Sequence, residues 1–389
     1  MIKNVTIGDL GNIVTGNTPP RSKPKLYGDH TPFIKATDIS ESEKHTYFSE
    51  ESYSKEGYEK YRSSLIPKGS TCVVTIGSIG KKMTMAHCDC FINQAMNAVI
   101  PNDDFDSEYV YYAIRNIIGN LKSLDSGTAS GRENVSKSAF SKMPISVESD
   151  KGKQIKIGRI LSSYDDLIEN NQKQIKLLEE AAQRLYKEWF VDLHFPGYEN
   201  TPLIDGVPQG WNRERLIDIA DVQYGFAFDG SLFNSDGNGT PIIRIRNIPD
   251  GTTKDYTTEE ADEQYIVKNG DIVVGMDGEF HINSWCGCDS YLVQRTCRIK
   301  PHNTNMNGYL LQAISEPIKF FESTVVGATV AHLGKKHIDT ITILTAPDEM
   351  YKPFQQYFNK RQLLLNQNQR LAEARDRLLP KLMSGELEV

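Results

Sequence analysis

The hydrophobic positions of the chain form two long helical patterns, and a region of short strand signals precedes each of them. In the first pattern, seam positions recur in alternating steps of three and four over about three heptads, as in a coiled coil. These positions are Ile168, Asn171, Ile175, Leu178, Ala182, Leu185 and Trp189. The second pattern follows 193 residues later and comprises Arg361, Leu364, Asn368, Leu371, Arg375, Leu378 and Leu382. We therefore predict two long helices.

The second pattern is poorly suited to self-association, because its leucines alternate with Arg, Asn and Arg. Polar groups at a coiled-coil seam need a partner that matches them. The helix of the first pattern is the natural candidate, so we predict that the two helices pair with each other. The alternative is that each amphipathic helix lies on its own domain.

The strand signals before each helix are short runs of β-branched and apolar residues bounded by Gly, Pro and Asn. In the first region they are Phe33–Ile39, Cys72–Ile76 and Ala95–Ile100. Asp106 is a candidate cap for a helix over 107–124, whose apolar positions follow helical spacing. The matching helix of the second region begins near Asn307 and meets Pro317, so we expect a kink or break there.

The two halves of the chain repeat the same blocks in the same order, and the offset between them drifts only by loop-sized steps. The matching pairs are Ile7–Gly16 with Leu216–Gly225, Thr31–Ile39 with Thr240–Ile248, Lys68–Val74 with Asn269–Val274, Ile92–Pro101 with Leu292–Pro301, Tyr109–Ala113 with Tyr309–Ala313, and Leu178–Leu185 with Leu371–Leu378. A repeat of about 200 residues is a duplicated domain with its own core rather than a solenoid. The expected boundaries are 1–150, 151–195, 196–346 and 347–389.

The composition is that of a globular protein, with 389 residues, 39% hydrophobic and 24% charged. No run of about 18 apolar residues predicts a membrane span, and the start of the chain resembles no signal peptide. Six cysteines are too few for a disulfide scaffold, so we expect a cytoplasmic protein. The net charge of −7 excludes a generally basic nucleic-acid coat protein. Residues 193–346 carry 12 basic and 20 acidic side chains, so a nucleic-acid binder would need its basic residues focused on one face there.

No catalytic motif is present. The segment Thr75–Lys82 ends like a phosphate-binding loop but lacks its leading Gly and the Ser or Thr after Lys81. No dinucleotide, zinc-protease, serine-hydrolase or deaminase motif occurs, and Thr18–Arg21 lacks the residues of an amino-methylating Asn-Pro-Pro-Tyr motif. An independent enzyme, such as a nuclease or deaminase, is therefore disfavoured.

Two Cys-x-Cys segments, Cys88–Cys90 and Cys286–Cys288, occupy matching places in the two halves. A zinc site needs four convergent ligands, usually from two spaced pairs. The remaining cysteines, Cys72 and Cys297, do not match each other. We therefore expect small, half-buried thiols in a hairpin and no metal site.

Polar loops with basic residues recur in both halves. Short loops of Arg, Lys, Asn, Ser and Thr offer the donors and the close backbone approach that phosphate and base-edge contacts require. The candidates for DNA binding are Thr18, Arg21, Lys23, Lys35, Thr37, Lys81, Lys82, Ser130, Arg132 and Asn134 in the first half, and Arg244, Arg246, His281, His332, Lys335 and Lys336 in the second. Each alone is more often a solvated surface group, but the recurrence favours a shared role over a coiled-coil scaffold without nucleic acid.

Four blocks of the sequence are distinctive when taken together. They are the opening Ile7–Leu10 with the strand Thr31–Ile39, the Gln94 strand that ends at Pro101, the helix Ile157–Phe190, and the helix Arg377–Glu386. These blocks resemble the specificity subunits of type I restriction–modification systems over essentially the whole chain. The acidic second domain and the proline in its helix depart from the usual pattern.

The resemblance implies a duplicated α/β (α+β) fold. Two target-recognition domains are separated by two long antiparallel coiled-coil helices and related by pseudo-two-fold symmetry. The expected seam residues are Ile168, Ile175, Leu178, Leu185, Trp189, Leu364, Leu371, Leu378 and Leu382.

In function, the resemblance implies a non-catalytic DNA-recognition subunit whose domains each read half of a bipartite double-stranded site. Its expected partners are two modification subunits, which use S-adenosylmethionine, and restriction subunits, which use ATP and Mg²⁺. The chain itself would bind no cofactor and no membrane. The alternatives are the specificity subunit of an orphan adenine-methylation system, and a sequence-specific DNA-binding scaffold of another kind.

Overall fold

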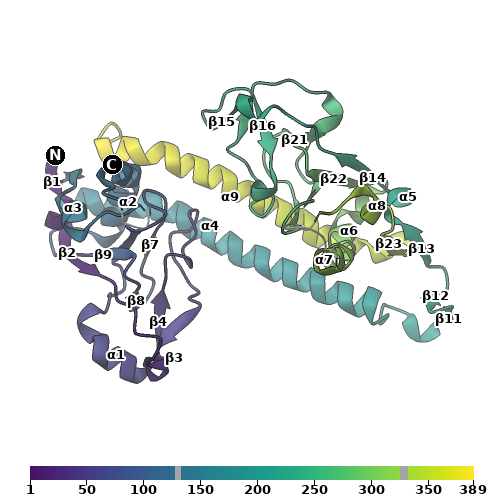
Figure 1. Ribbon diagram of the computed structural model, residues 1–389, viewed down its shortest axis with the longest axis horizontal. Helices are drawn as coiled ribbons and strands as arrows, with labels where there is room; N and C mark the ends of the chain where they lie inside the picture. Colours follow the sequence, from purple (N-terminus) through teal and green to yellow (C-terminus); the bar gives the residue numbers. More distant parts are fainter. Residues whose placement is uncertain (128–132, 325–331) are drawn as a thin grey trace. The chain divides into compact units, whose positions relative to one another are not determined.

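The structure is a computed structural model that describes residues 1–127, 133–324 and 332–389. It comprises two compact units. Unit 1 contains residues 1–169 and 370–389, and unit 2 contains residues 170–369 (Figure 1). Each unit is a globular region with one segment of each of two long helices, α4 (Lys151–Tyr186) and α9 (Lys352–Ser384).

The described residues of unit 1 form three small sheets and three short helices besides the long ones. Its strands are β1 (Ile2–Thr6), β2 (Gly11–Thr15), β3 (Tyr27–Gly28), β4 (Thr31–Ile34), β5 (Glu51–Tyr53), β6 (Thr71–Val74), β7 (Met83–Met85), β8 (Phe91–Ile92), β9 (Met96–Pro101) and β10 (Pro144–Glu148). Its short helices are α1 (Lys55–Tyr61), α2 (Ser107–Ile117) and α3 (Lys137–Lys142). The sheets have the strand orders β2-β9-β6-β7, β3-β5-β4-β8 and β1-β10.

The main core of unit 1 lies between α2, the β2-β9-β6-β7 sheet and the helix segments. Tyr109, Val110 and Leu161 in this core are fully buried, and Leu379 and Leu382 of α9 pack into the same cluster. The sheet that contains β3 and β4 has its own small aromatic cluster and lies with α1 at the end of the unit away from α2 and α3 (Figure 1). The unit thus has one lobe on the helices and one lobe remote from them.

Unit 2 repeats this topology. Its strands are β11 (Leu203–Ile204), β12 (Val207–Pro208), β13 (Asn212–Arg215), β14 (Ala220–Tyr224), β15 (Phe233–Asn234), β16 (Thr240–Ile243), β17 (Tyr256–Thr257), β18 (Ile266–Val267), β19 (Ile272–Gly275), β20 (Ile282–Ser284), β21 (Ser290–Leu292), β22 (Thr296–Pro301) and β23 (Thr342–Thr345). Its short helices are α5 (Leu216–Ile219), α6 (Asn307–Ala313), α7 (Ser315–Thr324) and α8 (Lys335–Ile338). The orders β14-β22-β19-β20, β15-β17-β16-β21-β18 and β13-β23 match those of unit 1, with β18 and the β11-β12 hairpin added.

A glycine at the end of the first repeated block makes the same backbone contact in both units. The backbone N–H of Gly16 donates to Met96 O at 3.1 Å, and that of Gly225 donates to Thr296 O at 3.0 Å. A Cβ on either glycine would lie about 2 Å from a backbone oxygen of the facing loop, at 2.1 Å for Gly16 and 2.0 Å for Gly225. Only glycine allows this close approach, which explains why both copies of the first block end in it.

The two long helices pair as the seam patterns predict. In unit 2, Asn171 donates to Asn368 at 2.9 Å and Arg361 donates to Glu179 at 2.6 Å, so the helices run antiparallel. In unit 1, Arg375 pairs with Asp165, and both side chains are almost fully buried. Each polar seam position of α9 therefore meets a matching polar group of α4, which explains why α9 is suited to this partner.

The apolar seam residues divide into two groups. Ile168, Ile175 and Leu364 are buried, and Leu178 and Leu371 are half-buried. The others lie where the helices meet the globular regions: Leu185 and Trp189 contact the core of unit 2, and Leu378 and Leu382 contact the core of unit 1. Trp189 follows the end of α4, in a π-helical turn over Lys187–Val191.

Several predicted elements differ in length from those observed. Asp106 caps α2 as expected, but α2 ends at Ile117 and continues as a 3₁₀ segment to Leu124. The expected break in the second copy occurs at Ile314, between α6 and α7, and Pro317 occupies the first turn of α7, where its missing N–H costs nothing. The strand predicted to extend to Ile39 ends at Ile34, because the following residues form a turn.

Candidate nucleic-acid interface

In unit 1, Arg21 and Lys35 converge on a carboxylate at the start of β5. Arg21 donates to both oxygens of Glu51, with Nη1–Oε1 at 2.5 Å and Nη2–Oε2 at 3.0 Å. The Lys35 ammonium pairs with Glu50 and lies 3.8 Å from Glu51. The hydrogen bonds from Arg21 hold the pKa of Glu51 below its ordinary value, and the Tyr27 ring lies 4.8 Å from the Arg21 guanidinium carbon. We call Arg21, Glu51 and Tyr27 the first carboxylate–arginine site.

In unit 2, Arg246 forms a similar forked pair. Its Nη2 donates to Asp255 Oδ1 at 2.6 Å and its Nε donates to Oδ2 at 3.2 Å. Asn247 donates to the same carboxylate at 3.1 Å. Burial alone would raise the pKa of Asp255, but the hydrogen bonds from Arg246 and Asn247 bring it below its ordinary value. Arg244 lies 5.5 Å from the Phe233 ring, and we call these residues together the second carboxylate–arginine site.

A third cluster in unit 2 surrounds Asp277. Its carboxylate accepts from Arg295, and His332 Nδ1 lies 2.5 Å from its other oxygen. Arg295 has a φ of 67°, in the left-handed region that a non-glycine residue rarely adopts. The neighbouring Gln294 is exposed and matches the exposed Gln94 of unit 1, which accepts a hydrogen bond from Thr18. The loop therefore presents an exposed glutamine in each copy, and its backbone is strained at Arg295 in unit 2.

The remaining candidates are mostly surface groups. Thr37, Lys23, Lys81, Lys335 and Lys336 are exposed, and Lys82 and His281 are half-exposed. The Lys82 ammonium donates to Ala36 O at 3.4 Å, and His281 lies 3.4 Å from Glu279. The Asn134 backbone N–H donates to Asp125 at 2.7 Å. Ser130 and Arg132 lie outside the described residues.

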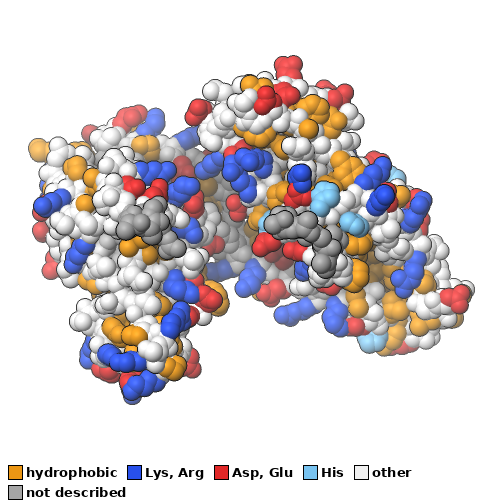
Figure 2. Space-filling view, viewed as in Figure 1, with side chains coloured by type: hydrophobic (Ala, Val, Ile, Leu, Met, Phe, Trp, Pro, Cys, Tyr) orange, Lys and Arg blue, Asp and Glu red, His pale blue; other side chains and the backbone are white. Residues whose placement is uncertain are grey.

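Sequence reasoning missed the carboxylates that hold these basic residues. Glu51, Asp255 and Asp277 were not candidates, because acidic side chains are not expected at a phosphate-binding surface. The repeat could have signalled Glu51 and Asp255, since each immediately precedes the residue that pairs with the proline of the Thr-Pro strand. Lys and Arg side chains also gather at the end of unit 1 that carries α1, β3 and β4 (Figure 2).

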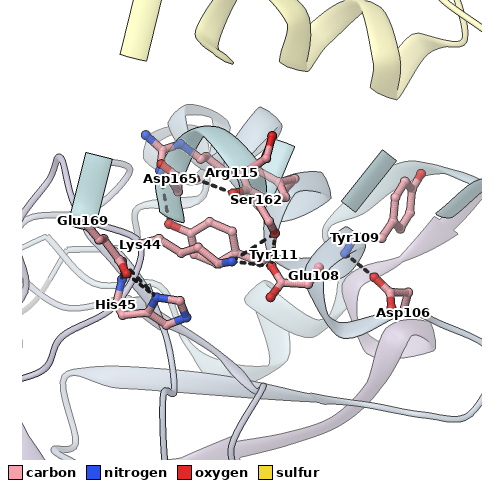
Figure 3. Close-up of polar contacts among 12 residues, drawn as sticks. Lys44, His45, Asp106, Glu108, Tyr109, Tyr111, Arg115, Ser162, Asp165 and Glu169 are labelled. Carbon is pink, nitrogen blue, oxygen red and sulfur yellow. Dashed lines mark hydrogen bonds and ion pairs between the residues drawn. The ribbon is translucent and has the colours of Figure 1, made fainter. Parts of the chain in front are cut away.

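The loop before β5 is fixed to α4 by a buried polar network (Figure 3). Lys44 is only 1% exposed, and its ammonium lies 2.5 Å from Glu108 and 3.1 Å from Ser162. The next residue, His45, contacts Glu169 through its backbone N–H at 2.9 Å and its ring at 2.8 Å. The network therefore attaches the loop that leads to β5 to the part of α4 that belongs to unit 1.

The cysteines are free thiols. Cys90 and Cys286 are buried, Cys88 is half-buried and Cys288 is exposed. Burial raises the pKa of the Cys286 thiol to about 11 and also raises that of Cys88. In the described parts of the chain, no three His, Cys, Asp or Glu side chains converge as metal ligands would. No helix among the described residues is long and apolar enough to span a membrane.

Comparison with known families resolves the identity of the fold. The family model of the type I restriction modification DNA specificity domain matches residues 2–180 and 208–372, one domain in each half of the chain. The chain belongs to this family. Specificity subunits are the non-catalytic components of restriction–modification complexes, which agrees with the lack of a catalytic motif in the sequence.

Two specificity subunits illustrate the relationship. The chain is 27% identical over 405 residues to the type I restriction enzyme MjaIX specificity subunit of Methanocaldococcus jannaschii, covering 98% of this chain and 93% of that protein. It is 32% identical over 142 residues to the EcoBI specificity subunit of Escherichia coli, covering 36% of this chain and 30% of that protein. The first of these similarities covers nearly the entire sequence.

A solved structure shares the fold. The crystal structure of the S subunit of a type I restriction–modification system from M. genitalium has a TM-score of 0.58 and 16% sequence identity, covering 98% of this chain and 96% of that chain. The predicted duplicated α/β fold with two long paired helices is therefore confirmed as the fold of a specificity subunit.

Proposed function

We propose that this specificity subunit recognises a bipartite DNA site, and that each unit reads one half of it. The observation that supports this most strongly is the duplication: two copies of one fold carry carboxylate–arginine sites built from different arginines. Identical copies would favour a palindromic site, whereas these copies differ at the surface that carries the donors. Arginine and lysine side chains on such loops are suited to base edges and phosphates.

Modification subunits would dock on this chain and methylate adenine with S-adenosylmethionine, and restriction subunits would use ATP and Mg²⁺. The chain would contribute recognition and no bond-making chemistry. We expect the purified chain alone to transfer no methyl group from S-adenosylmethionine to DNA. Transfer of radiolabel by this chain without a modification subunit would contradict the proposal.

Exchange of residues 1–150 for those of a family member with a different site should change one half-site only. The reason is that the globular part of each unit has its own core. Mapping of methylated adenines in cells that express the chimera and its modification partner provides the measurement. The reciprocal exchange of 196–346 is the matched control and should change the other half-site. Alteration of both half-sites by one exchange would show that the units read DNA jointly.

A further inference from the structure

The two carboxylate–arginine sites have their carboxylate at the same position of the repeated fold. Strand pairing aligns Tyr256 of unit 2 with Ser52 of unit 1, because each lies opposite the proline of the paired strand. The residue before each, Asp255 in unit 2 and Glu51 in unit 1, therefore occupies one equivalent position. Both residues are acidic, although the surrounding sequences differ.

The arginines, in contrast, come from different segments. Arg21 belongs to the loop before β3, and Arg246 belongs to the turn after β16. Side-chain exposure is 65% for Arg21 and 62% for Arg246, but only 23% for Glu51 and 12% for Asp255. Each carboxylate is thus mostly buried in the fold, whereas the guanidinium group that it binds is mostly exposed at the surface.

Stability does not account for this arrangement. Ion pairs with an exposed partner contribute little to folding, because solvent screens them and ordering long side chains costs entropy. A forked pair does fix the plane of a guanidinium, which is otherwise mobile. The aromatic ring beside Arg21 adds a second restraint at 4.8 Å. The arrangement is therefore suited to holding the guanidinium group in one orientation.

Each arginine keeps one edge with two donors. Arg21 uses its Nη1 and Nη2 atoms on Glu51, which leaves the edge formed by Nε and Nη2. Arg246 uses Nε and Nη2 on Asp255, which leaves the edge formed by Nη1 and Nη2. Two parallel N–H donors match the N7 and O6 acceptors that guanine presents in the major groove.

We infer that Glu51 and Asp255 are positioning residues that orient Arg21 and Arg246, so that each arginine reads one guanine in one half-site. The inference rests on the proposed function. It adds to that function the base that is recognised, guanine, and the carboxylates that orient the recognising arginines. Loss of either carboxylate leaves the arginine present but unoriented. Discrimination at one base pair should then fall by roughly 10- to 100-fold, while the other half-site is still read.

The test is a map of methylated adenines from cells that express the chain with its modification partner. The Asp255→Asn variant should relax one G·C pair in one half-site, and Arg246→Lys, which loses the fork, should relax the same pair. Glu51→Gln should relax a G·C pair in the opposite half-site. The half-site that stays unchanged in each map reports that the variant is folded and assembled.

The matched control is Asp218→Asn, since Asp218 forms an exposed forked pair with Arg215 at 2.8 Å in the same unit. This variant should leave the motif unaltered. A uniform loss of methylation with an unchanged motif would show that Asp255 is only structural and would overturn the inference. If the unsubstituted chain directs no bipartite motif, the proposed function itself fails.

A second measurement needs no protein variant. Duplexes that carry the mapped motif receive 7-deazaguanine, which lacks the N7 acceptor, at one guanine at a time. Binding by the assembled complex should weaken at least about fivefold at one guanine in each half-site. If no guanine in a half-site shows this loss, the inference is wrong for that unit.

Discussion

Replacement of Asp165 by alanine is expected to lower the free energy of unfolding of unit 1 by about 3 kcal/mol. Its partner Arg375 is a seam residue of α9, and the exposed fractions of the two side chains are only 2% and 3%. Arginine keeps its charge under all ordinary conditions, so the variant would bury a guanidinium without its main partner. The Tyr112 hydroxyl, which donates to Asp165, would also lose its acceptor. The expected loss lies at the lower end of the range for buried pairs, because Asp376 still accepts from Arg375 at 2.9 Å.

The measurement must report on unit 1. All three tryptophans, Trp189, Trp211 and Trp285, belong to unit 2, so their fluorescence does not follow this transition. Hydrogen exchange of the α2 amides as a function of urea concentration does follow it.

Two control variants separate the buried charge from a general effect on the helices. Asp165→Leu combined with Arg375→Met should recover most of the loss, because a buried ion pair is replaceable by apolar side chains of similar volume. Arg184→Ala removes an exposed pair with Glu180 at 3.8 Å and should change stability by less than about 0.5 kcal/mol. An equally large effect of Arg184→Ala would contradict the argument from burial.

The fold was largely predictable because its strongest signals are periodic or repeated. The alternation of three and four residues in Ile168 to Trp189 is a property of the helix itself, and the Arg, Asn and Arg of the second seam predicted a matching partner. The repeat supplied the two copies of the globular region. Boundaries were less predictable, since α2 changes at Ile117 into a 3₁₀ segment and β4 ends at Ile34 in a tight turn closed by Lys35 and Asp38, and neither change interrupts the apolar pattern.

The candidate site was predictable only in part. The sequence singled out Arg21, Lys35 and Arg246 as candidates for DNA binding, because polar loops with basic residues recur in both copies. It did not identify the carboxylates Glu51 and Asp255, which lie 30 and 9 residues away from the arginines they hold. Such pairs depend on strand register, which a single sequence leaves open. The acidic charge of the second half, at first an argument against DNA binding, now includes a residue that orients an arginine.

The length of the helices should determine the number of unread base pairs between the half-sites. Because α4 has 36 residues, it rises by about 54 Å, and both units include part of it. DNA advances by about 34–36 Å per turn, so a helix of this length can connect two reading domains that act about one turn apart. The spacing of the methylated site would then follow from the helix pair.

Insertion of seven residues into both helices, near Gln174 and Gln367, tests this prediction. These points lie between the Asn171–Asn368 and Glu179–Arg361 contacts, so a full heptad in each helix keeps the seam in phase. The insertion adds about 10 Å, close to three base-pair steps. It also demands about 100° more DNA twist, which should cost some affinity.

Insertion of four residues into α4 alone is the matched control, and it should disrupt the seam as a stutter and destabilise the pair. The map of methylated adenines should show both half-sites retained and the gap lengthened. A folded, active double-insertion variant with an unchanged gap would show that the helices do not set the spacing.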